Sequence, residues 1–126
     1  MKILKLLIVI SIFLFTGCSK TKINNDLYAT WVFSKHENQI HEYVKGSNFI
    51  EDRPGIKFKR NGEIIKRQNV GWCGTPPVTY DNYPGSWTSI SDNSINITYE
   101  YWGGTGNQNW KIIDLTNQTL KIKIEY

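Results

Sequence analysis

Cysteine and histidine are scarce in this sequence, with two of each among 126 residues. The histidines, His36 and His41, are five positions apart, which places them on opposite faces of a strand and out of register on a helix. Glu51 and Asp52 are adjacent and would project to opposite sides of an extended chain, so they do not form an acid–base pair. The sequence also lacks a Gly-x-Ser-x-Gly motif and a glycine-rich phosphate loop. It therefore predicts a protein that is not an enzyme and has no catalytic residue, metal site or cofactor.

A strong excess of one charge is also missing. Fifteen basic and eleven acidic side chains give a net charge of +4, to which residues 1–17 contribute two lysines and no acid. The rest of the chain therefore has a net charge of only +2. Basic residues alternate with apolar ones at residues 57–60 and 121–123, which is typical of the solvated face of a strand. Surfaces that bind nucleic acid concentrate their basic residues instead, so no nucleic-acid partner is expected.

The N-terminus has the layout of a secretory signal peptide. Lys2 and Lys5 form a short basic start, a nearly uninterrupted apolar run follows, and two small residues precede Cys18. The apolar run ends at residue 15 and is too short to span a bilayer, which requires about 20 residues. This arrangement resembles a bacterial lipoprotein signal, which implies that residues 1–17 are removed and that Cys18 is the lipidation site.

This resemblance implies an anchor and a location. Acyl chains such as palmitate on Cys18 would tether the protein to a membrane, because each buried CH2 group contributes about 0.8 kcal/mol. Ser19 stands where an aspartate retains enterobacterial lipoproteins in the inner membrane, so the outer membrane of the bacterial cell envelope is favoured, on its periplasmic or surface face. Acylation of Cys18 would leave Cys73 unpaired, as a small buried residue, a free thiol or an intermolecular link.

The remaining chain is long enough for one domain. Removal of residues 1–17 leaves 109 residues, of which residues 18–26 form the lipidated N-terminus and a polar linker. Residues 27–126 form the domain, which we expect to be monomeric.

Apolar and polar residues alternate with a period of two over much of this domain, which indicates half-buried strands. Asn61 and Gly62 form the strongest hairpin signal, because both residues tolerate positive φ. A short helical turn is expected near residues 36–43. Seven or eight consecutive strands with tight turns predict an all-β, antiparallel up-and-down β-barrel of about eight strands, which has no exposed sheet edge. The expected strands cover residues 28–35, 43–50, 55–60, 63–70, 86–90, 94–101, 108–115 and 119–126.

The order of motifs resembles that of the bacterial lipocalin-like lipoproteins. Ala29-Thr30-Trp31 stands where this family has Gly-x-Trp at the start of its first strand. Residues 56–63 are similar to the family's apolar-x-Phe-x-x-(Asp/Asn)-Gly hairpin, and residues 85–97 and 110–122 resemble the later strand pairs. The resemblance implies a lipocalin-like barrel that binds a small, partly apolar, hydrophobic ligand at its mouth.

Three differences from the family pattern bear on this expectation. Ala29 replaces the leading glycine, and the last strand has no arginine to pack over the tryptophan, so Lys121 or Lys123 would take that position. The chain is also shorter than a typical lipocalin. Eight strands can either be filled by side chains or hold one small ligand, so both outcomes are open.

Residues 71–87 form the most unusual stretch, with four aromatic residues, three prolines and three glycines. Each proline removes a backbone donor, so we expect a structured loop over one end of the barrel and not a regular strand. The loop would either line a ligand site or seal the barrel as a plug. The aromatic residues assigned to ligand binding are Trp72, Tyr80, Tyr83 and Trp87.

A second aromatic group lies in residues 99–110, where Trp102 and Trp110 flank glycines and amides. Flat aromatic rings beside amides are typical of sugar-binding surfaces, but the same composition arises when the tryptophans of a hairpin pack inward. The sequence thus leaves two alternatives to small-ligand binding. One is a lipoprotein that docks on a protein partner as an adaptor or inhibitor, and the other is a carbohydrate-binding module.

Overall fold

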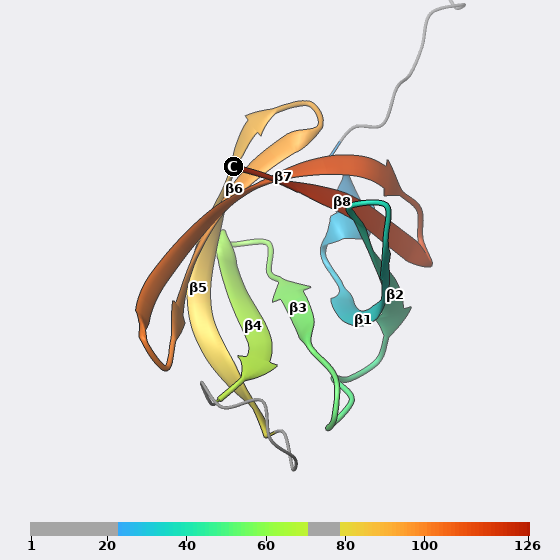
Figure 1. Ribbon diagram of the computed structural model, residues 1–126. Coiled ribbons are helices and arrows are strands. Elements are labelled where there is room, and N and C mark those ends of the chain that lie inside the picture. The colour runs from blue at the N-terminus through green and yellow to red at the C-terminus, as the bar shows by residue number, and fades with distance from the viewer. Residues whose placement is uncertain (1–22, 71–78) are drawn as a thin grey trace, which may run out of the picture.

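The computed structural model describes residues 23–70 and 79–126 and shows a closed, antiparallel β-barrel of eight strands (Figure 1). One 3-10 turn, η1 (Asn25–Leu27), precedes the first strand. The predicted all-β class, the antiparallel arrangement and the number of strands are confirmed. The strands are β1 (Thr30–Glu37), β2 (Ile40–Gly46), β3 (Gly55–Phe58), β4 (Glu63–Asn69), β5 (Tyr80–Ser91), β6 (Ser94–Tyr101), β7 (Gly104–Leu115) and β8 (Thr119–Glu125).

The strand order around the barrel is β1-β2-β8-β7-β6-β5-β4-β3, and β3 closes onto β1. This differs from a strict up-and-down order at one place, since β1 lies between β2 and β3. Residues 47–54 therefore have to pass β1 to connect β2 with β3. Val32, on the outer face of β1, is only 2% exposed, and a Cβ on Gly55 would lie 2.8 Å from the Phe49 ring. The connection thus packs closely against the outside of the barrel.

The η1 turn closes one end of the barrel. Leu27 is fully buried, and its carbonyl accepts a hydrogen bond of 3.0 Å from Trp31 Nε1. Arg60, in the turn between β3 and β4, reaches the same end. Its guanidinium lies 4.8 Å from the centre of the Tyr28 ring and donates to Asn25 Oδ1 at 3.3 Å.

A row of aromatic rings fills the interior beyond η1. The Phe58 and Trp110 rings are 6.3 Å apart, Trp110 and Tyr43 are 5.8 Å apart, and Tyr43 and Phe33 are 5.7 Å apart. Each large apolar side chain that is fully buried contributes about 1.5–3 kcal/mol. The aliphatic residues packed around these rings are Ile56, Ile64, Ile95, Ile97, Ile112, Leu120 and Ile122.

The hairpin predicted at Asn61 and Gly62 is confirmed. Gly62 has a φ of +89°, and the Glu63 amide donates to Asn61 Oδ1 at 3.0 Å. At the turn between β7 and β8, Thr116 Oγ1 accepts from the amide of Thr119 at 2.9 Å. Polar side chains therefore stabilise both turns.

The helical turn predicted near residues 36–43 is wrong, because β1 and β2 form a tight hairpin there. Asn38 and Gln39 occupy the turn with φ values of +52° and +67°. Positive φ at both positions matches the right-handed twist of the flanking strands. The glycine that usually marks the second position of such a turn is replaced by Gln39, so the sequence signal is weak.

The strands β5 and β7 are longer than predicted. β5 starts at Tyr80, so the prediction of a loop is wrong for residues 80–85, while the strand predicted over residues 86–90 lies within β5. β7 starts at Gly104, which places most of the predicted glycine-rich hairpin loop within the β6–β7 ladder.

Pro84 is accommodated within β5 by its position at the end of a ladder. The pairing of β5 with β6 begins at Gly85, opposite Tyr99. Pro84, which has no backbone N–H to donate, therefore lies one residue beyond the end of this ladder. The next carbonyl of β6, Glu100 O, accepts a hydrogen bond of 2.8 Å from Gln68 Nε2 instead. A side chain of β4 thus replaces the backbone donor that proline lacks.

The predicted signal peptide, its lipidation site Cys18 and the leftover Cys73 lie outside the described residues. Within residues 23–70 and 79–126, no helix has the length and apolar character needed to cross a membrane.

Candidate functional site

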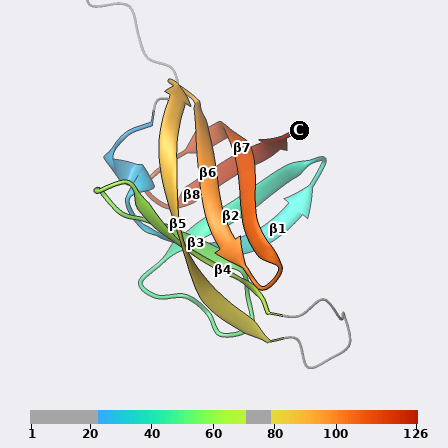
Figure 2. The same cartoon turned by 90° about the vertical axis from the view of Figure 1, so that its left-hand side faces the viewer.

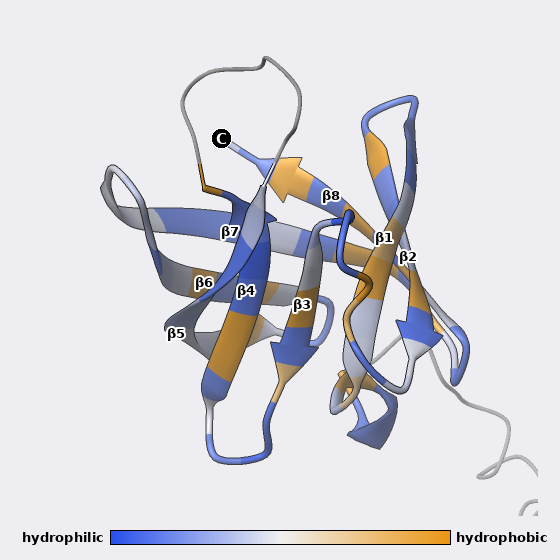
Figure 3. Cartoon of the chain, turned by 90° about the horizontal axis from the view of Figure 1, so that it is seen from below, coloured by the Kyte–Doolittle hydropathy of each residue, from blue (hydrophilic) through white to orange (hydrophobic). Residues whose placement is uncertain are grey.

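The inner wall of the barrel becomes polar with distance from η1. β4 and β6 both start beside η1, since Arg60 bonds to Asn25 and the Ile23 amide donates to Asp92 O at 3.1 Å. Figure 3 shows β4 changing from apolar near its start to hydrophilic toward its end. Figure 2 shows η1 and the end of β8 on opposite sides of the barrel. We call the end away from η1 the polar end, with inner side chains Phe33, His41, Lys66, Gln68 and Tyr99.

Lys66 is the central side chain of the polar end. It follows the buried Ile64 by two positions in β4, so it points to the same inner face. Its Nζ lies 4.7 Å from the centre of the Tyr99 ring on β6 and donates to Gln68 Oε1 at 3.2 Å. Burial lowers the pKa of Lys66 to about 8. The ammonium form still dominates at pH 7, but it is less stable than in water.

Every aspartate and glutamate of the sequence lies within the described residues, so all side-chain carboxylates that could pair with Lys66 are accounted for. None of these carboxylates lies within 4.0 Å of Lys66 Nζ; the ion pairs of the described chain involve Lys35, Lys59 and Lys121. Lys66 is therefore a largely buried cation that makes no ion pair with an aspartate or glutamate.

Tyr99 is positioned by a glycine on the neighbouring strand. Gly106 of β7 lies directly opposite Tyr99, and a Cβ there would lie 2.5 Å from Tyr99 Cζ. The absence of a side chain at this position gives the Tyr99 ring the room to lie against β7, where it faces the Lys66 ammonium. A cation over an aromatic face is stabilised by about 0.5–2 kcal/mol, depending on desolvation.

His36 and His41 pair across the β1–β2 hairpin. Their rings stack at 4.3 Å between centres, with an angle of 20° between their planes. The prediction that they lie on opposite faces is wrong, because the turn at Asn38 and Gln39 folds the two strands onto each other. The pKa of His41 is lowered by burial first, and then by the charges of His36 and Lys66.

A pocket of about 610 Å³ opens beside His41. The β2–β8 ladder ends at the pair of His41 and Ile122, so the two strands separate beyond it and leave this gap. Its volume falls within the range of small-molecule sites. The pocket is lined by His36, Gln39, His41, Lys123, Ile124, Glu125 and Tyr126.

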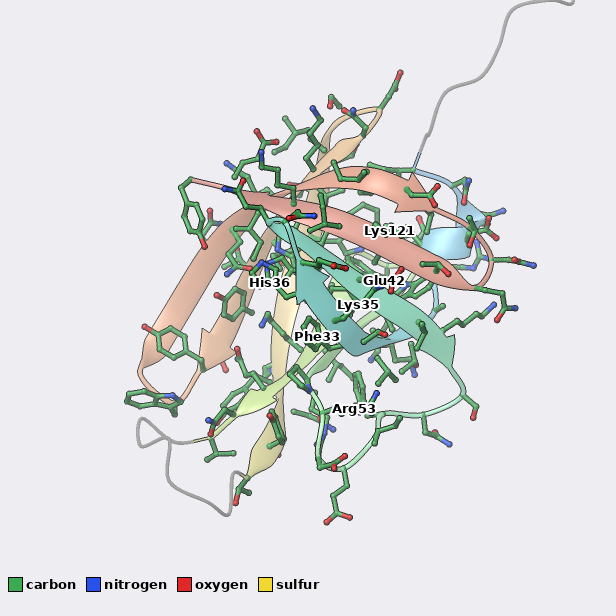
Figure 4. The ribbon with its side chains drawn as sticks, turned by 45° about the vertical axis from the view of Figure 1, so that its right-hand side comes forward. Phe33, Lys35, His36, Glu42, Arg53 and Lys121 are labelled. Carbon is green, nitrogen blue, oxygen red and sulfur yellow. The ribbon has the colours of Figure 1, made fainter. Side chains whose placement is uncertain are left out.

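Ion pairs gather on the outer face next to this pocket, as Figure 4 shows for Lys35, Glu42 and Lys121. Glu42 lies 3.9 Å from Lys35 Nζ and 3.7 Å from Lys121 Nζ. Lys121, one of two lysines that could have packed over the tryptophan, thus forms an ion pair with Glu42 on the outside of the barrel. Near η1, the cation that packs on an aromatic ring is Arg60, which lies over Tyr28.

The predicted ligand-binding residues are spread along β5. Tyr83 lies directly opposite Lys66 and so belongs to the polar end, and Tyr80 lies opposite Asn69. Trp87 is at the η1 end, where its ring is 6.1 Å from Tyr28 and its Nε1 donates to Lys59 O at 3.4 Å. Seven residues of strand, roughly 23 Å, separate Tyr80 from Trp87. The structure therefore does not bring these residues into one site, and Trp72 lies outside the described residues.

The second aromatic group divides between core and surface. Trp110 is 1% exposed and belongs to the core, while Trp102 is 50% exposed at the turn between β6 and β7. On the outer face of these strands, Asn96 and Asn107 exchange hydrogen bonds of 2.9 and 3.0 Å. The amides that a sugar site would use are largely bonded to each other.

Among the described residues, no group of three or more histidine, cysteine, aspartate or glutamate side chains is placed to hold a metal ion. Comparisons of the chain with known protein families, curated proteins and solved structures found no match.

Sequence reasoning missed Lys66, His41 and Tyr99 as site residues. The phase of β4 is ambiguous in the sequence, because Ile64 and Ile65 are both apolar and either could face the core. Gln68 was the signal that could have revealed the site. If Ile64 faces the core, the period of two in a strand places Lys66 and Gln68 on the same inner face. Ligand pockets combine an apolar lining with a few polar groups, so two inward polar side chains made this end of the barrel a candidate site.

Proposed function

We propose that this chain is a non-catalytic lipoprotein of the bacterial cell envelope, whose lipocalin-like barrel binds a small, partly apolar molecule at the polar end. Lys66 is the observation that supports ligand binding. A largely buried cation without a carboxylate lowers the stability of a fold, and such groups concentrate at functional sites. The pocket beside His41 has a suitable volume, about 610 Å³.

The packing of the barrel limits where this ligand lies and how large it is. The rings from Phe58 to Tyr43 occupy the interior next to η1, and Tyr43 is only 8% exposed. A ligand would therefore lie at the mouth, against Phe33, His41 and Tyr99, and would not occupy a deep central cavity.

Native mass spectrometry tests the binding proposal. All eight strands lie between Ile23 and Tyr126, so a chain that starts at Ser19 contains the whole barrel. Purified gently from the native host, this chain is expected to carry a small molecule that is released on denaturation. Ile124→Trp would narrow the pocket and reduce occupancy, and Ile90→Trp, at a 57% exposed position, is the matched control. Wild-type protein that is free of ligand at every stage would contradict the proposal.

The anchor has a separate test. Full-length Cys18→Ala is expected to lose signal cleavage and acylation, so metabolic labelling with palmitate should mark only the wild-type protein. Ser19→Ala is the control and should be labelled and cleaved normally. Equal labelling and processing of the Cys18→Ala variant would contradict lipidation at this residue.

Docking on a protein partner is the second candidate function. Trp102 supports it, because a tryptophan that is 50% exposed at a turn is an anchor of the kind found at protein interfaces. A partner captured by the wild-type chain and lost from Trp102→Ser, with no small molecule bound, would favour this function.

A further inference from the structure

We propose that the ligand is a small apolar monocarboxylic acid, whose carboxylate binds the Lys66 ammonium while its apolar part lies against Phe33 and Tyr99. This inference rests on the proposed ligand-binding function and names the chemical class of the ligand. It is carried by the surroundings of Lys66, which supply a hydrogen-bond acceptor and an aromatic face but no carboxylate within ion-pair distance.

The donors of Lys66 leave one position for a ligand oxygen. An ammonium has three N–H groups. One donates to Gln68 Oε1 at 3.2 Å, and the Tyr99 ring, 4.7 Å away, covers another direction. Gln68 Nε2 is held by Glu100 O at 2.8 Å, which fixes the amide with its oxygen toward Lys66. The remaining direction suits a single acceptor.

The charges around Lys66 favour an anion. No aspartate or glutamate lies within ion-pair distance of Lys66, and these residues are all within the described chain. His41 on the opposite wall adds no negative charge. The pocket beside it is lined by Lys123, by Glu125 and by Tyr126 with its terminal carboxylate, and neither carboxylate is within ion-pair distance of Lys66. A ligand carboxylate would supply the counter-ion that the protein lacks.

The number of charges points to a carboxylate and not to a phosphate. Phosphate groups are usually held by several donors, often from arginine or consecutive backbone amides. The neighbouring Arg67 projects from the other face of β4, where it donates to Ile50 O and Glu51 O in the β2–β3 connection and to Asn82 Oδ1 on β5. A single ammonium with one free direction matches a monoanion.

The apolar surfaces next to Lys66 indicate what the acid carries. Tyr83 lies opposite Lys66 on β5, and Tyr99 lies beside it on β6. Across the mouth, the Phe33 ring is 6.2 Å from His41, which lines the pocket. A chain or ring of modest size would contact these faces, and the filled interior below Tyr43 excludes a long one.

Two probes of equal length separate the charge from the apolar part. Decanoate and decan-1-ol are titrated at pH 7 into the chain that starts at Ser19, and binding is measured by calorimetry. We expect decanoate to bind about ten- to a hundredfold more tightly than decan-1-ol, because a hydrogen bond to a charged group has this strength. Lys66→Met should remove this preference and leave decan-1-ol binding unchanged. Lys57→Met, on the exposed face of β3, is the matched control and should keep the preference.

The outcomes distinguish the two proposals. If the wild type binds both probes equally, or if Lys66→Met keeps the preference for decanoate, the carboxylate proposal is overturned and ligand binding at the polar end stands. If neither probe binds, the carboxylate proposal is overturned, and the outcome of native mass spectrometry decides the ligand-binding proposal separately.

The Lys66 ammonium gives a second readout that does not depend on affinity. The ¹³Cε resonance of Lys66, assigned by its loss in Lys66→Met, should titrate at a higher pH with decanoate present than with decan-1-ol, because a bound carboxylate stabilises the ammonium. An identical titration with both probes would overturn the proposal.

Discussion

Lys66 shows how a single residue can oppose the stability of the fold that contains it. Its neighbours on the inner face of β4 are Ile64, which is 1% exposed, and Gln68. The Gln68 amide and the Tyr99 ring replace part of the hydration that the Lys66 ammonium loses on burial. No carboxylate forms an ion pair with it to replace the rest. At this position a purely structural role would be served better by an apolar side chain of similar length.

Lys66→Met is therefore expected to stabilise the protein. The pKa of Lys66 is lowered from 10.5 to about 8, and this corresponds to an unfavourable contribution of order 1–3 kcal/mol below pH 8. Urea denaturation at pH 7 should show this gain in the free energy of unfolding. The control Lys57→Met should change it by less than about 0.5 kcal/mol. A loss of stability in Lys66→Met would mean that its bonds to Gln68 and Tyr99 outweigh desolvation.

The same shift predicts how the gain depends on pH. Because the pKa of Lys66 is lower in the folded state, the unfolded state binds more protons between pH 8 and 10.5, and the wild type becomes more stable as the pH rises through this range. The stability difference between Lys66→Met and the wild type should then shrink from pH 8 upward. A difference that stays constant between pH 7 and 10 would contradict a lowered pKa.

His41 affects stability at acid pH. Burial, His36 and Lys66 lower the pKa of His41 below 6.5 in the folded state, so its contribution is present above pH 6.5 and is lost as the pH falls. We expect His41→Gln to lose less stability than the wild type between pH 7 and 5, as measured by thermal unfolding. Parallel curves for the two proteins would show that His41 does not titrate differently on folding.

At the scale of elements, the turns show where local sequence is sufficient. Asn61 and Gly62 have the residue types that their backbone requires, and the β3–β4 hairpin was predicted from them. The β1–β2 turn has the same need for positive φ but fills its second position with Gln39, so its local sequence does not indicate a hairpin. β5 shows a third case, in which Pro84 is permitted only because the ladder to β6 ends beside it.

Gln39→Gly is expected to stabilise the β1–β2 hairpin by about 0.5–1 kcal/mol, because glycine adopts a φ of +67° without steric cost. Gly62→Ala is the reverse substitution, in which a residue with a side chain replaces glycine at a φ of +89°. It should destabilise the protein by about 1 kcal/mol. Melting temperatures of both variants test the pair. A lower melting temperature for Gln39→Gly would show that the Gln39 side chain stabilises the turn by contacts that outweigh its backbone strain.

At the scale of the whole molecule, the barrel has two unlike ends. One is closed by η1, with Leu27 buried beneath the Trp31 indole, and the aromatic interior continues from it. The other carries Lys66, His41 and an adjoining pocket. The closed end holds most of the buried apolar side chains, so it is expected to contribute most of the free energy of unfolding. Substitutions at the polar end should then cost less stability.

Leu27→Ala should reduce the free energy of unfolding by about 2–5 kcal/mol, since it opens a cavity at the closed end. Val44→Ala, at a position 39% exposed, is the control and should cost less than about 1 kcal/mol. Chemical denaturation of both variants measures the difference. Similar losses in the two variants would show that η1 does not seal the barrel.

Strand content, the number of strands and most of the turns follow from local sequence, because period-two alternation and turn residues act over a few positions. Which strands become neighbours depends on tertiary packing. It placed β1 between β2 and β3, stacked His36 on His41, and extended β5 through Pro84. It also decided that Lys66 meets Tyr99 inside the barrel, since Ile64 and Ile65 leave the phase of β4 open until the strand packs. Closure of the barrel sets that phase, because only one face of β4 can join the apolar core.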